Sequence, residues 1–335
     1  MQSLSLGDLS QSLILNRHNV RLRSALQSLS TESTTGMAAD QSARLHGNFA
    51  QIAGIEASLT LLNAYRNVGA ETQNKANMMQ EALKTVQDQA AALGADLLTA
   101  QTGRSSAQID ILGAQAAQGL DLAMKALNTS LGESALFSGQ KTATIALAGS
   151  DQLLGALSTA ISAAQATSAS DIQDVVTAWF GSPAGFSAMI YQGGSPLDPV
   201  CVSADQTVQL DITAADPAIV DTLKALSLGA LLSRGILAGS AVARADLAQR
   251  AGQQLVAAQV PMTALSARLG TLQASLQDAT TRNDAEDSAL QNARLSLLSV
   301  DPYETATKMQ DVQTQLQTLY AITARVSRLS LVDFL

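Results

Sequence analysis

Residues 255–300 read LVAAQVPMTALSARLGTLQASLQDATTRNDAEDSALQNARLSLLSV, and this stretch decides the fold class. Its apolar residues recur at alternating steps of three and four, the heptad rhythm of a helix that packs along another helix. The seam passes through polar Asn283 and Glu286, and its other positions are Leu255, Ala258, Met262, Leu265, Leu269, Leu272, Leu276, Ala279, Leu290, Ala293, Leu297 and Val300. The stretch predicts one helix of about 45 residues, or about 65 to 70 Å at about 1.5 Å per residue.

Two segments on the N-terminal side keep the same rhythm. They are the run Ile52, Ile55, Leu59 and Leu62 and the run Met79, Leu83, Val86, Ala90, Leu93 and Leu97. Seams of this length need partners, and the flanks of one chain can supply them by packing antiparallel. The sequence therefore predicts a mainly α fold: a long antiparallel coiled-coil helical bundle formed by the N- and C-terminal flanks, with a small inserted α+β middle domain.

The middle of the chain, 141–235, has a different character. Ser150-Asp151, Ser170-Asp171 and Asp216-Pro217 are typical helix starts, the last leading to about Leu232. The segments 188–192 and 200–213 predict short strands, with turns at nearby glycines and prolines. We expect three divisions: terminal assembly helices at 1–45 and 301–335, a helical coiled-coil core domain at 46–140 and 236–300, and an inserted α+β head domain at 141–235.

The last segment opens with Asp301-Pro302-Tyr303-Glu304, which predicts an N-cap aspartate, proline at the first helical position and a glutamate at the third. The side chains of Asp301 and Glu304 can satisfy free backbone donors there. Both terminal segments carry an apolar stripe at helical spacing, and two helices alone leave much of such a stripe uncovered. The predicted assembly residues are Leu4, Leu13, Val20, Leu26, Leu29, Met309, Val312, Leu316, Leu319, Ile322, Val326 and Leu329.

Composition excludes several classes of protein. The 335 residues are 47% apolar but only 3% aromatic, which suits close helix packing better than a large ligand pocket. The net charge is −8, of which residues 141–235 contribute −5, so nucleic acid is an unfavourable partner. The most apolar window, 225–243, contains Arg234 and is short for a bilayer span, so we expect no membrane helix. We also expect no cleaved signal peptide, because the N-terminus lacks the features of one.

The sequence has few side chains that could act in catalysis or bind a metal. His18 and His46 lie far apart in the sequence, and the aspartates of the middle domain lack calcium-loop spacing, so we expect no metal. The lone Cys201 is predicted to be a small buried residue rather than a nucleophile. Asn128-Thr129-Ser130 matches a glycosylation sequon at an expected helix end. We therefore expect no catalytic residue, no cofactor and no enzyme activity.

The two ends carry a family resemblance. The C-terminal run from Asp301 to Gln310, continued by 313–325 and by the final Leu329-Ser330-Leu331-Val332-Asp333-Phe334-Leu335, resembles the C-terminal helix of the bacterial flagellin family. Leu136-Phe137-Ser138-Gly139-Gln140-Lys141-Thr142 resembles a segment of the hook-associated protein of the hook-filament junction, of the hook-associated protein 3 type. The stretch 33–42 departs from the Lys-Asp-Asp-Ala-Ala-Gly-like run of filament flagellins, which favours the junction protein over flagellin.

The resemblance implies a structural function. The chain would be an extracellular flagellar subunit, exported by the flagellar type III apparatus and assembled through its terminal helices. Its partners would be copies of itself, a neighbouring hook-associated protein, flagellin and an export chaperone that binds the stripe from Leu316 to Leu335. Filament flagellin is the alternative, and a coiled-coil tip or adhesin module that binds a ligand through the acidic middle is a further one.

Overall fold

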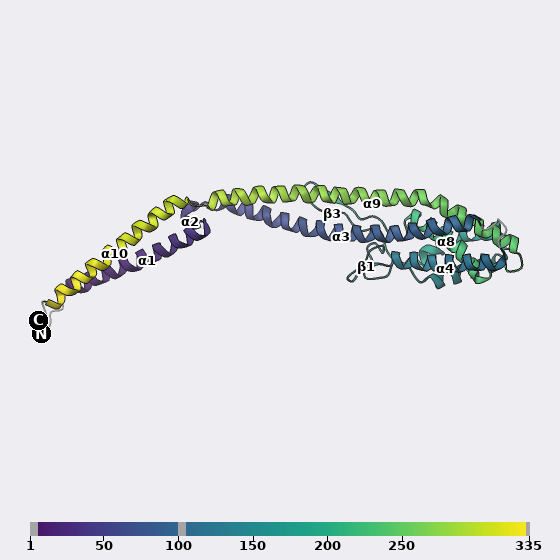
Figure 1. Cartoon of the computed structure of the whole chain (residues 1–335), viewed down its shortest axis with the longest axis horizontal. Coiled ribbons are helices and arrows are strands. Elements are labelled where there is room, and N and C mark those ends of the chain that lie inside the picture. Colours follow the sequence, from purple (N-terminus) through teal and green to yellow (C-terminus); the bar gives the residue numbers. More distant parts are fainter. Residues whose placement is uncertain (1–5, 100–104, 333–335) are drawn as a thin grey trace. The chain divides into compact units, whose positions relative to one another are not determined.

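The computed structural model describes residues 6–99 and 105–332 (Figure 1). The chain divides into two compact units, Met1–Asn63 with Asp284–Leu335, called here the terminal unit, and Ala64–Asn283, called the body unit. Both boundaries fall inside long helices, α3 (Ala50–Leu98) and α9 (Ala241–Leu298). The three-part division expected from the sequence therefore differs from the observed one, in which the middle segment 141–235 belongs to the body unit.

Within the body unit α3 and α9 run antiparallel. Gln87 Nε2 donates to Ser266 Oγ at 3.1 Å, and Gln273 Nε2 donates to Asn77 Oδ1 at 2.8 Å, so positions rise along one helix as they fall along the other. The predicted seam residues of α3 from Met79 to Leu97 are all buried, as are those of α9 from Leu255 to Leu269. At 58 residues α9 is longer than predicted, because its heptad seam is preceded by Ala- and Gln-rich turns that also favour helix.

Two glycines allow α3 and α9 to approach closely. A Cβ on Gly252 would lie 2.7 Å from the backbone nitrogen of Leu98 and 3.1 Å from the carbonyl oxygen of Gly94. A Cβ on Gly94 would lie 3.3 Å from the Cβ of Leu255. The seam therefore ends in a contact in which one backbone packs directly on the other.

Helices α4 (Ser106–Leu127) and α8 (Pro217–Ala230), followed by the 3₁₀ turn η2 (Leu231–Arg234), complete the core of the body unit. The Asp216 side chain caps α8 by accepting from Ala218 N at 3.1 Å, as the sequence predicts. Nearly every residue of α8 from Thr222 to Ala230 is buried. Because α8 packs along α4, and its Gly229 lies against Ala116 and Leu97, the middle segment is part of the same compact unit as the long helices.

Two more helices, α5 (Ser150–Ala163) and α6 (Ala169–Gly181), pack on each other next to this core. Both were predicted from their acidic starts, although the capping residue of α6 is Ser168, whose hydroxyl accepts from Asp171 N at 3.1 Å. The strand expected over 188–192 is wrong in part, because Phe186–Met189 forms the single helical turn α7. Only Tyr191 makes a β-bridge, to Leu147.

The described strands are four short ones. Hairpins join β1 (Ser130–Leu131) to β2 (Ser134–Ala135) and β3 (Val200–Cys201) to β4 (Thr207–Val208). Short strands were predicted over 200–213, and they are confirmed at 200–201 and 207–208, whereas 209–213 forms no strand. Cys201 is exposed, contrary to its predicted burial, because it lies on the open face of a two-residue strand. Even so, the prediction of a mainly α fold with a small α+β insert is confirmed.

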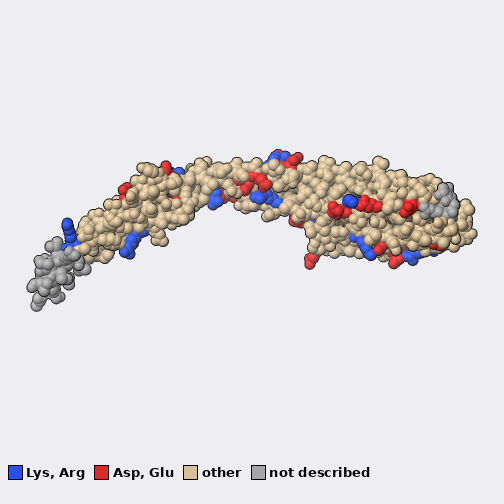
Figure 2. Space-filling view, viewed as in Figure 1, with Lys and Arg blue, Asp and Glu red and all other residues tan. Residues whose placement is uncertain are grey.

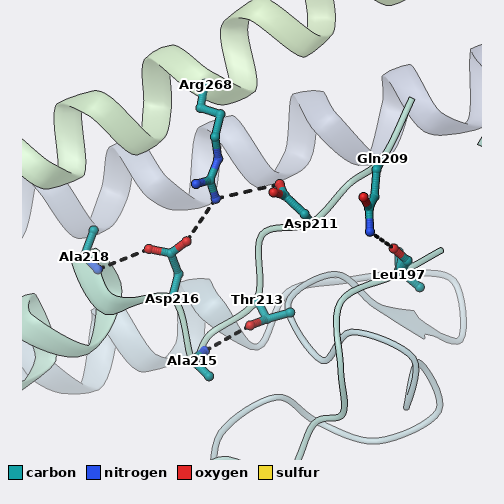
Figure 3. A network of polar contacts seen from close by, with 8 residues as sticks. All are labelled: Leu197, Gln209, Asp211, Thr213, Ala215, Asp216, Ala218 and Arg268. Atoms are coloured by element: carbon teal, nitrogen blue, oxygen red, sulfur yellow. Dashed lines mark hydrogen bonds and ion pairs between the residues drawn. The ribbon is translucent and has the colours of Figure 1, made fainter. Parts of the chain in front are cut away.

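The segment after β4 is fastened to α9 by charge rather than by strand pairing (Figure 3). Arg268 Nη2 lies 3.0 Å from Asp216 Oδ2 and 3.7 Å from Asp211 Oδ1. Gln209 Nε2 donates to the carbonyl oxygen of Leu197 at 2.8 Å, and Thr213 Oγ1 accepts from Ala215 N at 3.3 Å. The two ion pairs of Arg268 neutralise part of the acidic charge of the middle segment within the body unit.

The polar interruption of the α9 seam has a structural purpose. Asn283 is 3% exposed, and its Nδ2 donates to the carbonyl oxygen of Val202 at 2.7 Å, next to a small cluster in which Val202 and Val208 pack on Leu276 and Ala279. A leucine here would extend the seam but leave the Val202 carbonyl without this donor.

We expect Asn283→Ala to lower the free energy of unfolding by about 1 to 3 kcal/mol, because it removes a donor from a buried acceptor. Urea unfolding followed by circular dichroism measures this loss. Asn292→Ala, at an exposed position of the same helix, is the control and should change little. Equal stability of the two variants would show that the Asn283 bond is dispensable.

The side chain of Asn128, at the predicted sequon, forms hydrogen bonds through both its oxygen and its nitrogen. Asn128 ends α4, its Nδ2 donates to the carbonyl oxygen of Leu147 at 2.8 Å, and its Oδ1 accepts from Leu147 N at 2.8 Å. A glycan on this amide would break both bonds, so the sequon is a structural site in the folded protein.

Candidate assembly surface of the terminal helices

The terminal unit is built on α1 (Leu6–Thr35) and α10 (Pro302–Val332), which pack side by side in opposite directions (Figure 1). The Arg23 guanidinium donates to Tyr320 Oη through Nε at 3.2 Å and through Nη2 at 2.9 Å. The short helix α2 (Gln41–Arg44) follows α1. Backbone bonds from Ala38 N to Leu298 O (2.9 Å) and from Val300 N to Gly36 O (3.1 Å) fix the inner ends of the pair.

The start of α10 has the predicted cap. Asp301 Oδ1 accepts from Tyr303 N at 2.8 Å and from Glu304 N at 3.2 Å, and Pro302 is the first helical residue. Glu304 differs from its expected capping role, because its carboxylate pairs with Lys308 Nζ at 2.7 Å along the helix. That hydrogen bond raises the pKa of Lys308. The structure therefore gives the cap to Asp301 alone.

One part of the predicted stripe is covered within the chain. Leu316 and Leu319 are buried, at 7% and 9% exposed, where α10 packs on α1. Four other predicted residues are half-buried: Leu26, Leu29, Met309 and Val312. The structure thus contradicts the expected exposed stripe at Leu316 and Leu319, because the opposite helix already covers them.

The remaining predicted residues point away from the helix pair. Leu13, Val20 and Ile322 are 62%, 69% and 46% exposed. The analysis of the sequence missed Ile14 and Tyr303, which are 53% and 82% exposed and lie off the stripes it traced. Leu4 lies outside the described residues, and so do the side chains of Val326 and Leu329. Large apolar side chains left in water at this density mark a surface that another protein covers.

A shallow groove of about 670 Å³ follows the exposed face of α1, with Leu13, Val20 and Ala25 as its apolar residues and Arg17 and Arg21 as its basic ones. Both arginines are exposed. Such a face suits an apolar helix that carries acidic residues along its edge.

Within the described part of the chain, no three His, Cys, Asp or Glu side chains are close enough together to hold a metal ion. No described helix is both long and apolar enough to cross a bilayer. Charged side chains are sparse and scattered over the drawn face of each unit (Figure 2).

Comparisons with known proteins agree with the geometry. Residues 253–335 match the model of the bacterial flagellin C-terminal helical region. The structure is similar to that of Bacillus cereus FlgL, with a TM-score of 0.50 and 13% identity over 72% of this chain and 100% of that protein. A putative flagellar hook-associated protein from Vibrio parahaemolyticus has a TM-score of 0.41 and 13% identity over 71% of this chain and 95% of its own. No curated protein matches the chain in sequence.

The resemblance read from the C-terminal residues is confirmed by the family match, which includes all of α10 and the seam of α9 from residue 253 onward. The likeness to FlgL extends over the whole of that protein and confirms the predicted fold class. Residues 253–335 of this chain are thus similar to the C-terminal helical region of the bacterial flagellins, and its fold is similar to that of Bacillus cereus FlgL.

Proposed function

We propose that this protein is a structural subunit of the bacterial flagellum, a hook-associated protein that joins hook to filament, and that it has no enzyme activity. One observation carries the proposal: the flagellin-type C-terminal helix pairs with α1, yet the pair leaves Leu13, Val20 and Ile322 about half or more exposed. A helix pair of this kind is completed by neighbouring subunits rather than by the rest of its own chain.

Assembly follows from this geometry. Copies that meet through different faces form an open helical array rather than a closed dimer, which is the symmetry a tube requires. The apolar residues of α1 and α10 gain burial only in the array, so the terminal pair becomes more stable when its neighbours are present. In this proposal the subunit acts outside the cell, after export through the flagellar type III apparatus.

The partners in this proposal are copies of the chain, a neighbouring hook-associated protein, flagellin and an export chaperone. Because Leu319 is covered by α1, a chaperone that binds it must first separate α10 from α1. Leu319→Asp with Leu329→Asp should then weaken chaperone binding, measured by calorimetry. Gln317→Asp, at an exposed position, is the control. Unchanged affinity of the double variant would place the chaperone site elsewhere.

Electron microscopy of a strain lacking the gene tests the function itself. A junction protein predicts complete hooks without filaments, with filament protein shed into the medium. Intact hooks and junctions with no filament protein made would identify the chain as filament flagellin instead. Normal flagella would contradict both flagellar functions and favour a tip or adhesin module, which would be tested by ligand binding to the acidic middle segment.

A further inference from the structure

The outer face of α9 in the body unit has an uncharged apolar stripe. Val256, Val260, Thr263 and Ala267 are all exposed and share one face at helical spacing, with Val256 and Val260 at 50% and 76% exposed. No charged residue occurs between Arg250 and Arg268. We call these four residues the α9 stripe. Solvent-facing helix surfaces usually carry charge, so this stripe is unusual for a surface meant to stay in water.

A second stripe of equal length lies on α4. Ile111, Gln115, Gln118 and Leu122 are exposed on one face, Ile111 at 59% and Leu122 at 49%, and no charge occurs between Asp110 and Asp121. We call these residues the α4 stripe. Each stripe spans about three helical turns. Helix α3 contacts both helices, because Gly119 of α4 lies against Leu93 and Gly94 of α3 lies against Leu255 of α9 (Figure 1). Both stripes are exposed, so neither covers the other within one copy.

The stripes are also complementary in hydrogen bonding. Pro261 lies inside α9 and has no amide hydrogen, so the carbonyl of Ala257, at the edge of the α9 stripe, loses its usual helical donor. The α4 stripe offers two glutamine amides at its centre. A glutamine of one copy can therefore donate to the Ala257 carbonyl of another, while the apolar residues on either side bury each other.

We propose that the α9 stripe of one copy docks on the α4 stripe of the next copy. The inference rests on the proposed function, because a subunit that forms an array needs head-to-tail contacts of this kind. A chain of net charge −8 repels its own copies, and contact through uncharged faces buries no unpaired charge. The charges at the stripe ends are already compensated: Arg268 by Asp216, Arg250 by Asp246, and Asp121 by Lys125.

The contact between the α9 stripe and the α4 stripe is a weak one. A helix pair of three turns buries much less than the roughly 1,200 Å² of a stable complex. The contact therefore adds to the terminal helices in an array but does not hold free subunits together.

Cross-linking of the full-length protein tests this pairing. With Cys201→Ser as background, one chain carries Val260→Cys and a second, tagged for size, carries Gln118→Cys. The two are mixed at high concentration and treated with a short bismaleimide. The control pair carries Ile145→Cys and Met189→Cys, both exposed positions of the same unit outside the stripes.

The mixed stripe pair should give the cross-linked heterodimer in clear excess over each chain alone and over the control pair. Adding Val256→Glu to the first chain should lower the yield by about tenfold or more, because docking would bury an unpaired carboxylate. A yield equal to the control pair, or cross-linking of the Val260→Cys chain chiefly to itself, would overturn the proposal. Neither result depends on the strain phenotype, so failure here leaves the proposed function standing.

Discussion

Deletion of Asp301–Leu335 is expected to abolish filament attachment and swimming while the body unit keeps its fold. The deletion removes α10 and with it the partner that covers the half-buried Leu26 and Leu29 of α1. The contacts within Ala64–Asn283 do not involve α10, so most of the helical structure should remain. Swimming assays and microscopy measure the first effect, and circular dichroism of the purified variant measures the second.

A single substitution in α10 should prevent this helix from packing on α1. Leu316→Asp places a carboxylate at a position that is 7% exposed and should also stop swimming, because the α1–α10 pair cannot close over an unpaired charge. Gln315→Asp introduces the same charge next to it at an exposed position and should leave swimming intact. Motile cells with the deletion, or collapse of the whole helical signal, would contradict the separation of assembly helices from body unit.

The largest expected effect on folding comes from Gly252→Leu. A Cβ here meets the Leu98 backbone nitrogen at 2.7 Å, so α3 and α9 must move apart and lose the burial of neighbouring seam residues. We expect a loss of about 3 kcal/mol in the free energy of unfolding, at the upper end of the usual cost of overpacking.

Gly270→Leu in the same helix is the matched control. A Cβ at Gly270 has no heavy atom within 4 Å, so the exchange should be neutral or stabilise the protein by up to about 1 kcal/mol through helix propensity. Urea unfolding of both variants decides the matter. If the two lose stability equally, the close approach of α3 and α9 at Gly252 is not what limits the side chain there.

The long helices could be predicted because their signal is repeated over many turns. Each seam residue from Met79 to Leu97 adds to the same heptad pattern, and one deviation does not hide it. The helix caps at Asp216 and Asp301 could also be predicted, because each capping side chain binds a backbone N–H only two residues further along the chain. The short strands were predicted less well: β3 and β4 lie within 200–213 as expected, but the rest of that segment forms no strand, and β1 and β2 were missed. Strands of two residues depend on tertiary contacts more than on their own residues.

The candidate surface was predicted only in part, since the stripe pattern says which residues are apolar but not which of them the same chain covers. Leu316 and Leu13 look alike in the sequence, yet one is buried against α1 and the other is 62% exposed. The difference depends on how far α1 and α10 rotate about their axes, which distant contacts such as Arg23 with Tyr320 help to fix. Exposed Ile14 and the α9 stripe were missed for the same reason.

The location of the protein on the flagellum tests the central claim most directly. Cys201 is the only cysteine and is exposed, so a biotin maleimide followed by gold can mark the folded protein on isolated flagella. The account predicts gold confined to the boundary between hook and filament, and none in a Cys201→Ser strain. Gold along the whole filament would identify a filament flagellin, and flagella without gold would contradict the flagellar function altogether.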